Sequence, residues 1–345
     1  MRVKKEDFYK VSKLHNISDE TSKQVWLELE SNSSSSFTIS NLAYYLGAMI
    51  IISSMGWFLT EAWDMANGLA ITSLGIIYFV IFTLVGRRLI KDKKLETPGG
   101  LLLTVAVSVV PLIIFGIEKY TGLWPFGNEE NFTEYHIWIR SSWILMEIST
   151  IIIGLIFLRM YKFTFLTFPV AFSLWYLSMD VTPLIFGQSE FTWEQKQWVS
   201  VAFGALMLVA TYFTDRRTKQ DYAFWGYLFG LLAFWGGLTS MDSDSEINKL
   251  IYCFINLFLM LISVVIQRRT FVVFGAIGVF SYLGHLTYSV FEDSLLFPVV
   301  LSVIGLAIIY FGIIYHKNRE RIEKKIQDSL PNALKKLNPQ NREKL

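Results

Sequence analysis

Long runs without a charged residue constrain the fold of this chain more than any other feature. Residues 41–60, 67–86 and 98–117 each contain no Asp, Glu, Lys or Arg. About 20 helical residues rise about 30 Å, which matches the hydrocarbon thickness of a bilayer. A segment of that length must satisfy its backbone hydrogen bonds internally, so each run is predicted to be a transmembrane α-helix. The alternation of about ten residues that marks membrane β-barrel strands is not seen.

Similar stretches recur along the chain, and the sequence predicts an all-α polytopic transmembrane bundle of about ten spans. Only 17% of the residues are charged, against about 25% in soluble domains. Asp180 and Pro183 interrupt the fifth span, so a shorter helix followed by a bent or re-entrant stretch is an alternative there. The predicted spans are residues 40–60, 67–86, 98–117, 140–159, 163–187, 197–214, 222–240, 247–267, 271–290 and 294–315.

Basic and acidic residues alternate from loop to loop in a way that indicates orientation. Clusters of Lys and Arg follow every second span, whereas the intervening loops are mainly acidic. Short cytoplasmic loops are enriched in Lys and Arg, so both termini are predicted to be cytoplasmic. The alternation also supports an even number of spans. The basic clusters lie at residues 87–94, 159–162, 216–219, 268–269 and 317–325.

Polar segments flank the predicted bundle of residues 39–316. Residues 1–38 predict two short helices and a Ser-rich linker, which together are too small to form a core of their own. This cytoplasmic helical pair therefore needs the membrane or a cytoplasmic protein partner. Residues 317–345 form a basic tail with an apolar stripe, which favours lying on the inner membrane surface over an extended disordered coil.

Ionisable side chains at membrane depth are costly, and they are the first candidates for function. Glu147, Asp180 and His285 are predicted to lie at a similar depth in the outer halves of their spans, with Arg140 at the outer start of the fourth. Two carboxylates and a histidine at one level could bind a cation or relay protons. In the structural alternative, each side chain is hydrogen-bonded to a neighbouring helix or is reached by water from outside.

Other chemistries find little support in the sequence. It contains no phosphate-binding loop, dinucleotide fingerprint, zinc-protease motif or nucleophile elbow, and it implies no cofactor. The single cysteine, Cys253, allows neither an intrachain disulfide nor a cysteine metal site. The basic loops are too short and scattered to bind nucleic acid. Glycine-rich stretches at residues 226–230 and 275–278 fit close helix packing.

Three stretches near the N-terminus carry a resemblance to known proteins. They are residues 17–26 (ISDETSKQVW), 42–50 (LAYYLGAMI) and 56–64 (GWFLTEAWD). This pattern, which covers roughly the first third of the chain, resembles a family of predicted bacterial multipass membrane proteins of unknown function with an N-terminal soluble helical pair. The resemblance implies a location in the bacterial inner membrane. It implies no catalytic or binding residues.

The function predicted from these features is transporter-like handling of a small solute or ion through the polar site in the outer half of the bundle. The alternative is a non-catalytic membrane scaffold or sensor that acts through its cytoplasmic ends. An intramembrane enzyme is a third class, and the lack of a paired nucleophile and base disfavours it. The bilayer is the one partner that the sequence requires.

Overall fold

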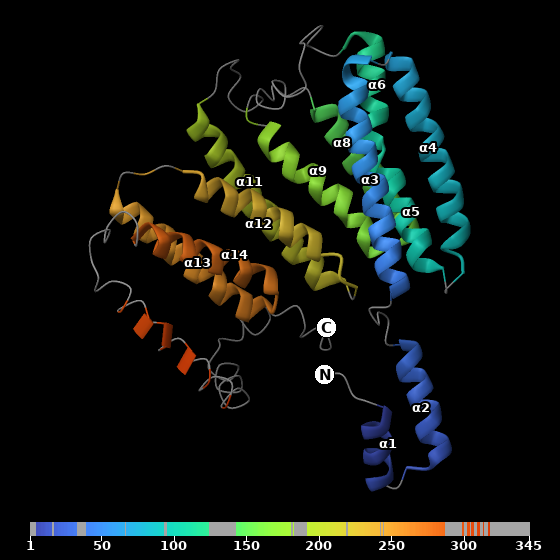
Figure 1. Ribbon diagram of the computed structural model, residues 1–345, viewed down its shortest axis with the longest axis vertical. Helices are drawn as coiled ribbons and strands as arrows, with labels where there is room; N and C mark the ends of the chain where they lie inside the picture. The colour runs from blue at the N-terminus through green and yellow to red at the C-terminus, as the bar shows by residue number, and fades with distance from the viewer. Residues whose placement is uncertain are drawn as a thin grey trace. The chain divides into compact units, whose positions relative to one another are not determined.

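Every element that the structure describes is a helix (Figure 1). The computed structural model describes residues 5–15, 17–32, 39–65, 67–92, 95–123, 143–180, 182, 192–218, 220–241, 243 and 245–286, with scattered residues from 299 to 317. No β-strand occurs within these residues. The prediction of an all-α fold is therefore confirmed. Pro183, most of the Ser-rich linker, most of the tenth predicted span and the tail from residue 318 lie outside the described residues.

The helices follow the apolar runs of the sequence. A helix lies in each of the first nine predicted spans, from α3 in the first to α14 in the ninth. The described residues between 299 and 317 are also helical. In chain order the elements are α1 (Lys5–Leu14), α2 (Asp19–Asn32), α3 (Ile39–Met65), α4 (Gly68–Leu89), α5 (Glu96–Ser108), α6 (Val110–Thr121), α8 (Ile144–Tyr161), the short 3₁₀ helix η1 (Thr164–Leu166), α9 (Thr167–Asp180), α11 (Trp193–Arg217), α12 (Phe224–Thr239), α13 (Glu246–Ile266) and α14 (Arg269–His285).

Five stretches within the described residues are long and apolar enough to cross a membrane. Two further apolar helical stretches are shorter, namely Ser40–Met55, which is part of α3, and Phe224–Thr239. A helix needs about 20 apolar residues to span the hydrocarbon core, so these lengths are those of a membrane protein. The five stretches are Gly68–Leu89, Glu96–Thr121, Ile144–Tyr161, Trp193–Arg217 and Glu246–Ile266.

The stretch Glu96–Thr121 consists of two helices, not one. Helix α5 ends at Ser108, α6 begins at Val110, and Val109 forms a turn between them. Pro111 lies in the first turn of α6, where its missing N–H is least costly. In an uninterrupted helix the proline ring would clash with the carbonyl of Val107 and remove one hydrogen bond. The chain therefore starts a new helix here.

Residues 1–51 form one compact unit and residues 52–345 form another. In the first unit α1 packs on α2, with the rings of Phe8 and Trp26 5.3 Å apart. Ser12 of α1 and Ser22 of α2 are buried, whereas Val11 and Leu14 are exposed. The helical pair thus leaves an apolar face of α1 uncovered within its own unit.

In the second unit, α4, α5, α6 and α8 enclose the first core. Its buried centre includes Ile71 of α4. A Cβ added at Gly68 would lie 2.6 Å from the carbonyl oxygen of Gly116, and one at Gly86 would lie 2.9 Å from that of Gly99. Such distances leave no room for a side chain, so glycine allows α4 to pack closely on α6 and α5.

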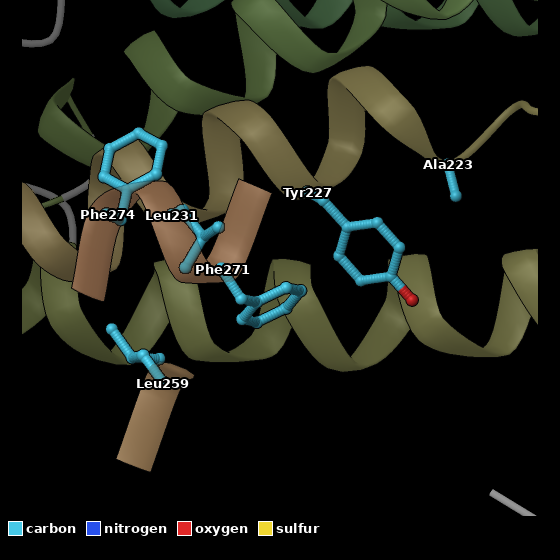
Figure 2. Close-up of a cluster of buried hydrophobic side chains, with 6 residues drawn as sticks. All are labelled: Ala223, Tyr227, Leu231, Leu259, Phe271 and Phe274. Atoms are coloured by element: carbon cyan, nitrogen blue, oxygen red, sulfur yellow. The ribbon is translucent and has the colours of Figure 1, made fainter. Parts of the chain in front are cut away.

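Helices α12, α13 and α14 build the second core of this unit (Figure 2). The ring of Tyr227 packs edge-on against Phe271 at 5.3 Å, and Leu231 is completely buried. The six buried members are Ala223, Tyr227, Leu231, Leu259, Phe271 and Phe274. Side chains from three helices thus meet in one cluster.

Asn256 joins the same three helices through polar contacts. Its side chain donates to the carbonyl oxygen of Tyr252 at 2.8 Å and accepts from the indole N–H of Trp235 at 3.0 Å. A Cβ at Gly278 of α14 would lie only 2.0 Å from its Oδ1. The prediction that the glycines of residues 275–278 serve close helix packing is confirmed.

Candidate functional site

The structure brings Glu147 and Asp180 together on adjacent helices. Glu147 lies in the first turn of α8, and Asp180 is the last residue of α9, which packs on α8. Both side chains are buried, with residue exposures of 4% and 0%. They lie close enough for their charges to interact. Two buried carboxylates thus lie within range of each other's charge.

Few groups compensate this pair of charges. Lys196, in the first turn of α11, interacts electrostatically with Asp180. The Trp143 backbone amide lies near Asp180, but no hydrogen bond of normal geometry from a described residue reaches either carboxylate of the pair. The ring of Tyr176 stacks on that of Trp143, and its phenol interacts electrostatically with both Glu147 and Asp180. Within the described residues, Glu147 thus has no compensating cation.

The arrangement is suited to holding a positively charged species. Two buried ionised carboxylates whose charges interact repel one another, and each loses hydration. A shared proton or a bound cation relieves both costs. Among the described residues no group of three or more His, Cys, Asp or Glu side chains could hold a metal ion. A proton, or a monovalent cation completed by water, is a species that two carboxylates can hold without further charged ligands.

The other two predicted site residues are placed differently. His285, at the end of α14, lies 3.1 Å from both carboxylate oxygens of Glu246 at the start of α13. Helix α14 packs on α13 and α12, whereas α8 packs on α9, α6 and α5. His285 therefore belongs to a different helix pair from Glu147. Arg140 lies outside the described residues.

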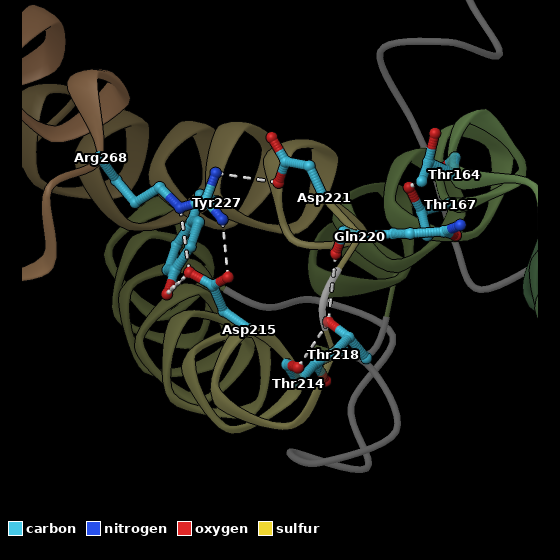
Figure 3. Close-up of polar contacts among 9 residues, drawn as sticks. All are labelled: Thr164, Thr167, Thr214, Asp215, Thr218, Gln220, Asp221, Tyr227 and Arg268. Carbon is cyan, nitrogen blue, oxygen red and sulfur yellow. Dashed lines mark hydrogen bonds and ion pairs between the residues drawn. The ribbon is translucent and has the colours of Figure 1, made fainter. Parts of the chain in front are cut away.

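A second polar cluster, which we call the Arg268 network, surrounds the turn between α13 and α14 (Figure 3). This turn is at the other end of both helices from Glu246 and His285. Arg268 donates from Nη2 to Asp215 Oδ1 at 2.6 Å and from Nε to Oδ2 at 3.0 Å. Its Nη1 donates to Asp221 Oδ1 at 2.9 Å, and its guanidinium lies 5.8 Å from the ring centre of Tyr227. The network thus joins α11, the α11–α12 loop, α12 and the α13–α14 turn.

Local backbone geometry positions the arginine. Gln267 ends α13 in the left-handed region at φ 59°, and Ser263 Oγ donates to the carbonyl oxygen of Arg268 at 2.9 Å. Burial alone lowers the pKa of Arg268, but the hydrogen bonds and charges of Asp215 and Asp221 outweigh burial and hold that pKa above its usual value. The guanidinium is therefore a permanent cation, and its bidentate bond neutralises the fully buried Asp215.

Reasoning from the sequence missed this network. In the sequence, Arg268 is one of the basic residues that indicate orientation, and neither Asp215 nor Asp221 belongs to a recognisable motif. The available signal was Asp215 itself, an acidic residue directly before Arg216 and Arg217 at a predicted basic end.

Comparisons with models of known families, with curated proteins and with solved structures find no match to this chain.

Proposed function

We propose that this protein is a membrane-spanning, transporter-like protein that binds a proton or small monovalent cation at Glu147 and Asp180. The observation that carries the proposal is the buried pair itself, which has no hydrogen bond of normal geometry from a described residue. Buried carboxylates without hydrogen bonds are costly to the fold, and such groups are typical of ion and proton pathways. Tyr176 and Lys196 complete the site and set its charge.

The proposal includes an orientation. Ten spans with cytoplasmic N- and C-termini would place the pair in the outer half of a bacterial inner membrane. The alternation of basic and acidic loops supports this arrangement. The site residues also agree with one common level, because Glu147 begins α8, Asp180 ends α9 and Lys196 begins α11. Arg140, three residues before Trp143, would supply a further counter-charge at the same level.

The test is cation flux into sealed proteoliposomes that contain the full chain. An entrapped pH dye reports protons, and a Na⁺ or K⁺ gradient of either sign tests the two monovalent cations. We expect Glu147→Gln and Asp180→Asn to reduce the flux to the level of empty vesicles. The matched control is Glu194→Gln, which removes an exposed carboxylate from the first turn of α11. The absence of H⁺, Na⁺ and K⁺ flux in vesicles that contain the wild-type protein would contradict the proposal.

A stability measurement separates a functional pair from a structural one. A charge kept for function is held at a cost to the fold, so Glu147→Gln should maintain or raise the melting temperature. If Glu147 served only as a structural partner, Glu147→Leu would cost about 1 kcal/mol, a typical interhelical hydrogen bond in a membrane. In that case Glu147→Gln would leave any flux unchanged.

A scaffold or sensor is the second candidate, and one observation favours it. The α1–α2 pair exposes Val11, Leu14, Ile17 and Val25, an apolar set suited to a protein partner or the membrane surface. Absent flux, together with a stoichiometric partner that is lost when residues 1–32 are removed, would favour this function over transport.

A further inference from the structure

A groove of about 390 Å³ opens between α8 and α11, with α9 as its floor. Leu158 of α8, Val170 of α9 and Met207 of α11 are among the side chains that line it. Leu155 and Leu206 at its sides are more than half exposed, so the groove is open to the surroundings of the bundle. An apolar groove on a membrane-spanning surface faces lipid.

The length of the groove corresponds to one leaflet. On α11 its lining runs from Phe203 to Thr214, a rise of about 16 Å at about 1.5 Å per residue. Half of a hydrocarbon core of about 30 Å is about 15 Å. An acyl chain of one leaflet could therefore lie along the groove from its polar end to the middle of the bilayer.

One end of the groove is polar and basic. Tyr222 lines that end, and its hydroxyl donates to the carbonyl oxygen of Lys162 at 2.6 Å. Lys162 is the left-handed residue that ends α8, and its backbone is joined to the groove end by this hydrogen bond. Arg217 follows the lining residue Thr214 by three residues on α11, so it continues the lining face of that helix. Both cations are exposed. Neither makes an ion pair with any described residue. Asp215, the acid two residues before Arg217, is neutralised by Arg268.

We propose that this groove binds one anionic phospholipid, with an acyl chain along α9 and the phosphate headgroup between Lys162 and Arg217. The charge of the mouth selects the headgroup, and the apolar lining selects a chain over a soluble phosphate. The site is separate from the Glu147–Asp180 pair, since it lies at the opposite ends of α8 and α11. The lipid would bridge α8 and α11 across α9.

The experiment compares two lipids with identical acyl chains on the purified full chain in neutral detergent. Native mass spectrometry measures bound phosphatidylglycerol or phosphatidylcholine, and tryptophan fluorescence follows melting. We expect phosphatidylglycerol to bind about 30-fold tighter, the preference that two surface cations provide, and to raise the melting temperature more. The double variant Lys162→Gln/Arg217→Gln should bind the two lipids equally. High salt should also reduce the preference of the wild type for phosphatidylglycerol, because it screens the two cations.

Two further variants make the result specific. The matched control Arg87→Gln/Arg88→Gln removes two exposed cations from the end of α4, away from the groove lining, and should keep the preference. Ala210→Trp places a large side chain in the groove at an exposed position. This variant should bind both lipids more weakly than wild type does. Equal binding of the two lipids by wild type would overturn the proposal, as would full competition by glycerol phosphate. So would a headgroup-independent effect that scales with protein concentration, which would indicate a second copy in the groove.

Discussion

Asp215 is buried directly before Arg216 and Arg217, yet its ion pair is with Arg268, 53 residues along the chain. Successive residues of a helix project in different directions, so a neighbour at i+1 or i+2 does not face the carboxylate. The ring of Tyr212 instead holds Arg216, whose guanidinium lies 5.9 Å from the ring centre. A distant arginine can approach along the fork direction and use two donors at once. The buried charge is thus satisfied by tertiary contact.

The Arg268 network predicts unequal effects at its two acids. Asp215→Asn should destabilise the protein by about 2–3 kcal/mol, less than a fully buried broken pair because Arg268 retains some exposure. Asp221→Asn should cost less than about 1 kcal/mol, since its side chain is half exposed. Unfolding in a denaturing detergent series measures both. Equal losses would show that Asp215 is not the anchor of the network.

Gly278 predicts a coupled pair of substitutions. Gly278→Ala should destabilise by about 1–3 kcal/mol, because the new methyl group collides with Asn256 and the side chain must move. Asn256→Ala alone should cost about 1 kcal/mol through two lost hydrogen bonds. The destabilisation of the double variant should be smaller than the sum of the two single destabilisations, as thermal melting can show. Simple additivity would mean that the collision is relieved elsewhere.

Depth along a helix can be counted from the sequence, but the identity of neighbouring helices cannot. Counting predicts similar depths for Glu147, Asp180 and His285. Glu147 lies at the N-terminal end of its helix, and Asp180 and His285 lie at the C-terminal ends of theirs. Which of them meet depends on packing between helices, and this placed His285 beside Glu246. Whether the Glu147–Asp180 pair binds anything stays a prediction.

At the scale of elements, apolar run length locates helices and misses their interruptions. Each of the first nine predicted spans contains a helix, since a run of about 20 apolar residues has no other way to satisfy its backbone in a bilayer. Hydropathy sums cannot register Pro111, because proline is compatible with an apolar run while it breaks the hydrogen-bond ladder. Pro111 alone would have predicted the break between α5 and α6.

The first two helices should be removable. Because α1 and α2 pack on each other within residues 1–51, deletion of residues 1–30 should leave a monodisperse, membrane-inserted protein. Size-exclusion chromatography in detergent and membrane extraction with carbonate measure the two properties. Aggregation of the shortened chain would mean that these helices are needed to cover apolar surface of the bundle.

For the whole molecule, the distribution of charge predicts how the chain lies across the membrane. In a Cys253→Ser background, Asn128→Cys and Ser243→Cys should react with an impermeant maleimide in intact cells. Lys93→Cys and Thr218→Cys should react only after lysis, because the basic loops are expected on the cytoplasmic side. Reversed labelling would contradict the orientation, and external labelling of all four would contradict the count of spans.

The cores of the second unit are local in sequence, and this has a consequence for synthesis. One core draws on residues between 55 and 166, and the clusters around α9 to α14 draw on residues between 168 and 274. Because domains fold as the ribosome releases them, the helices up to α8 can finish packing while the later ones are still being made. Asp215 is then synthesised 53 residues before its partner, so its ion pair can form only after Arg268 has emerged.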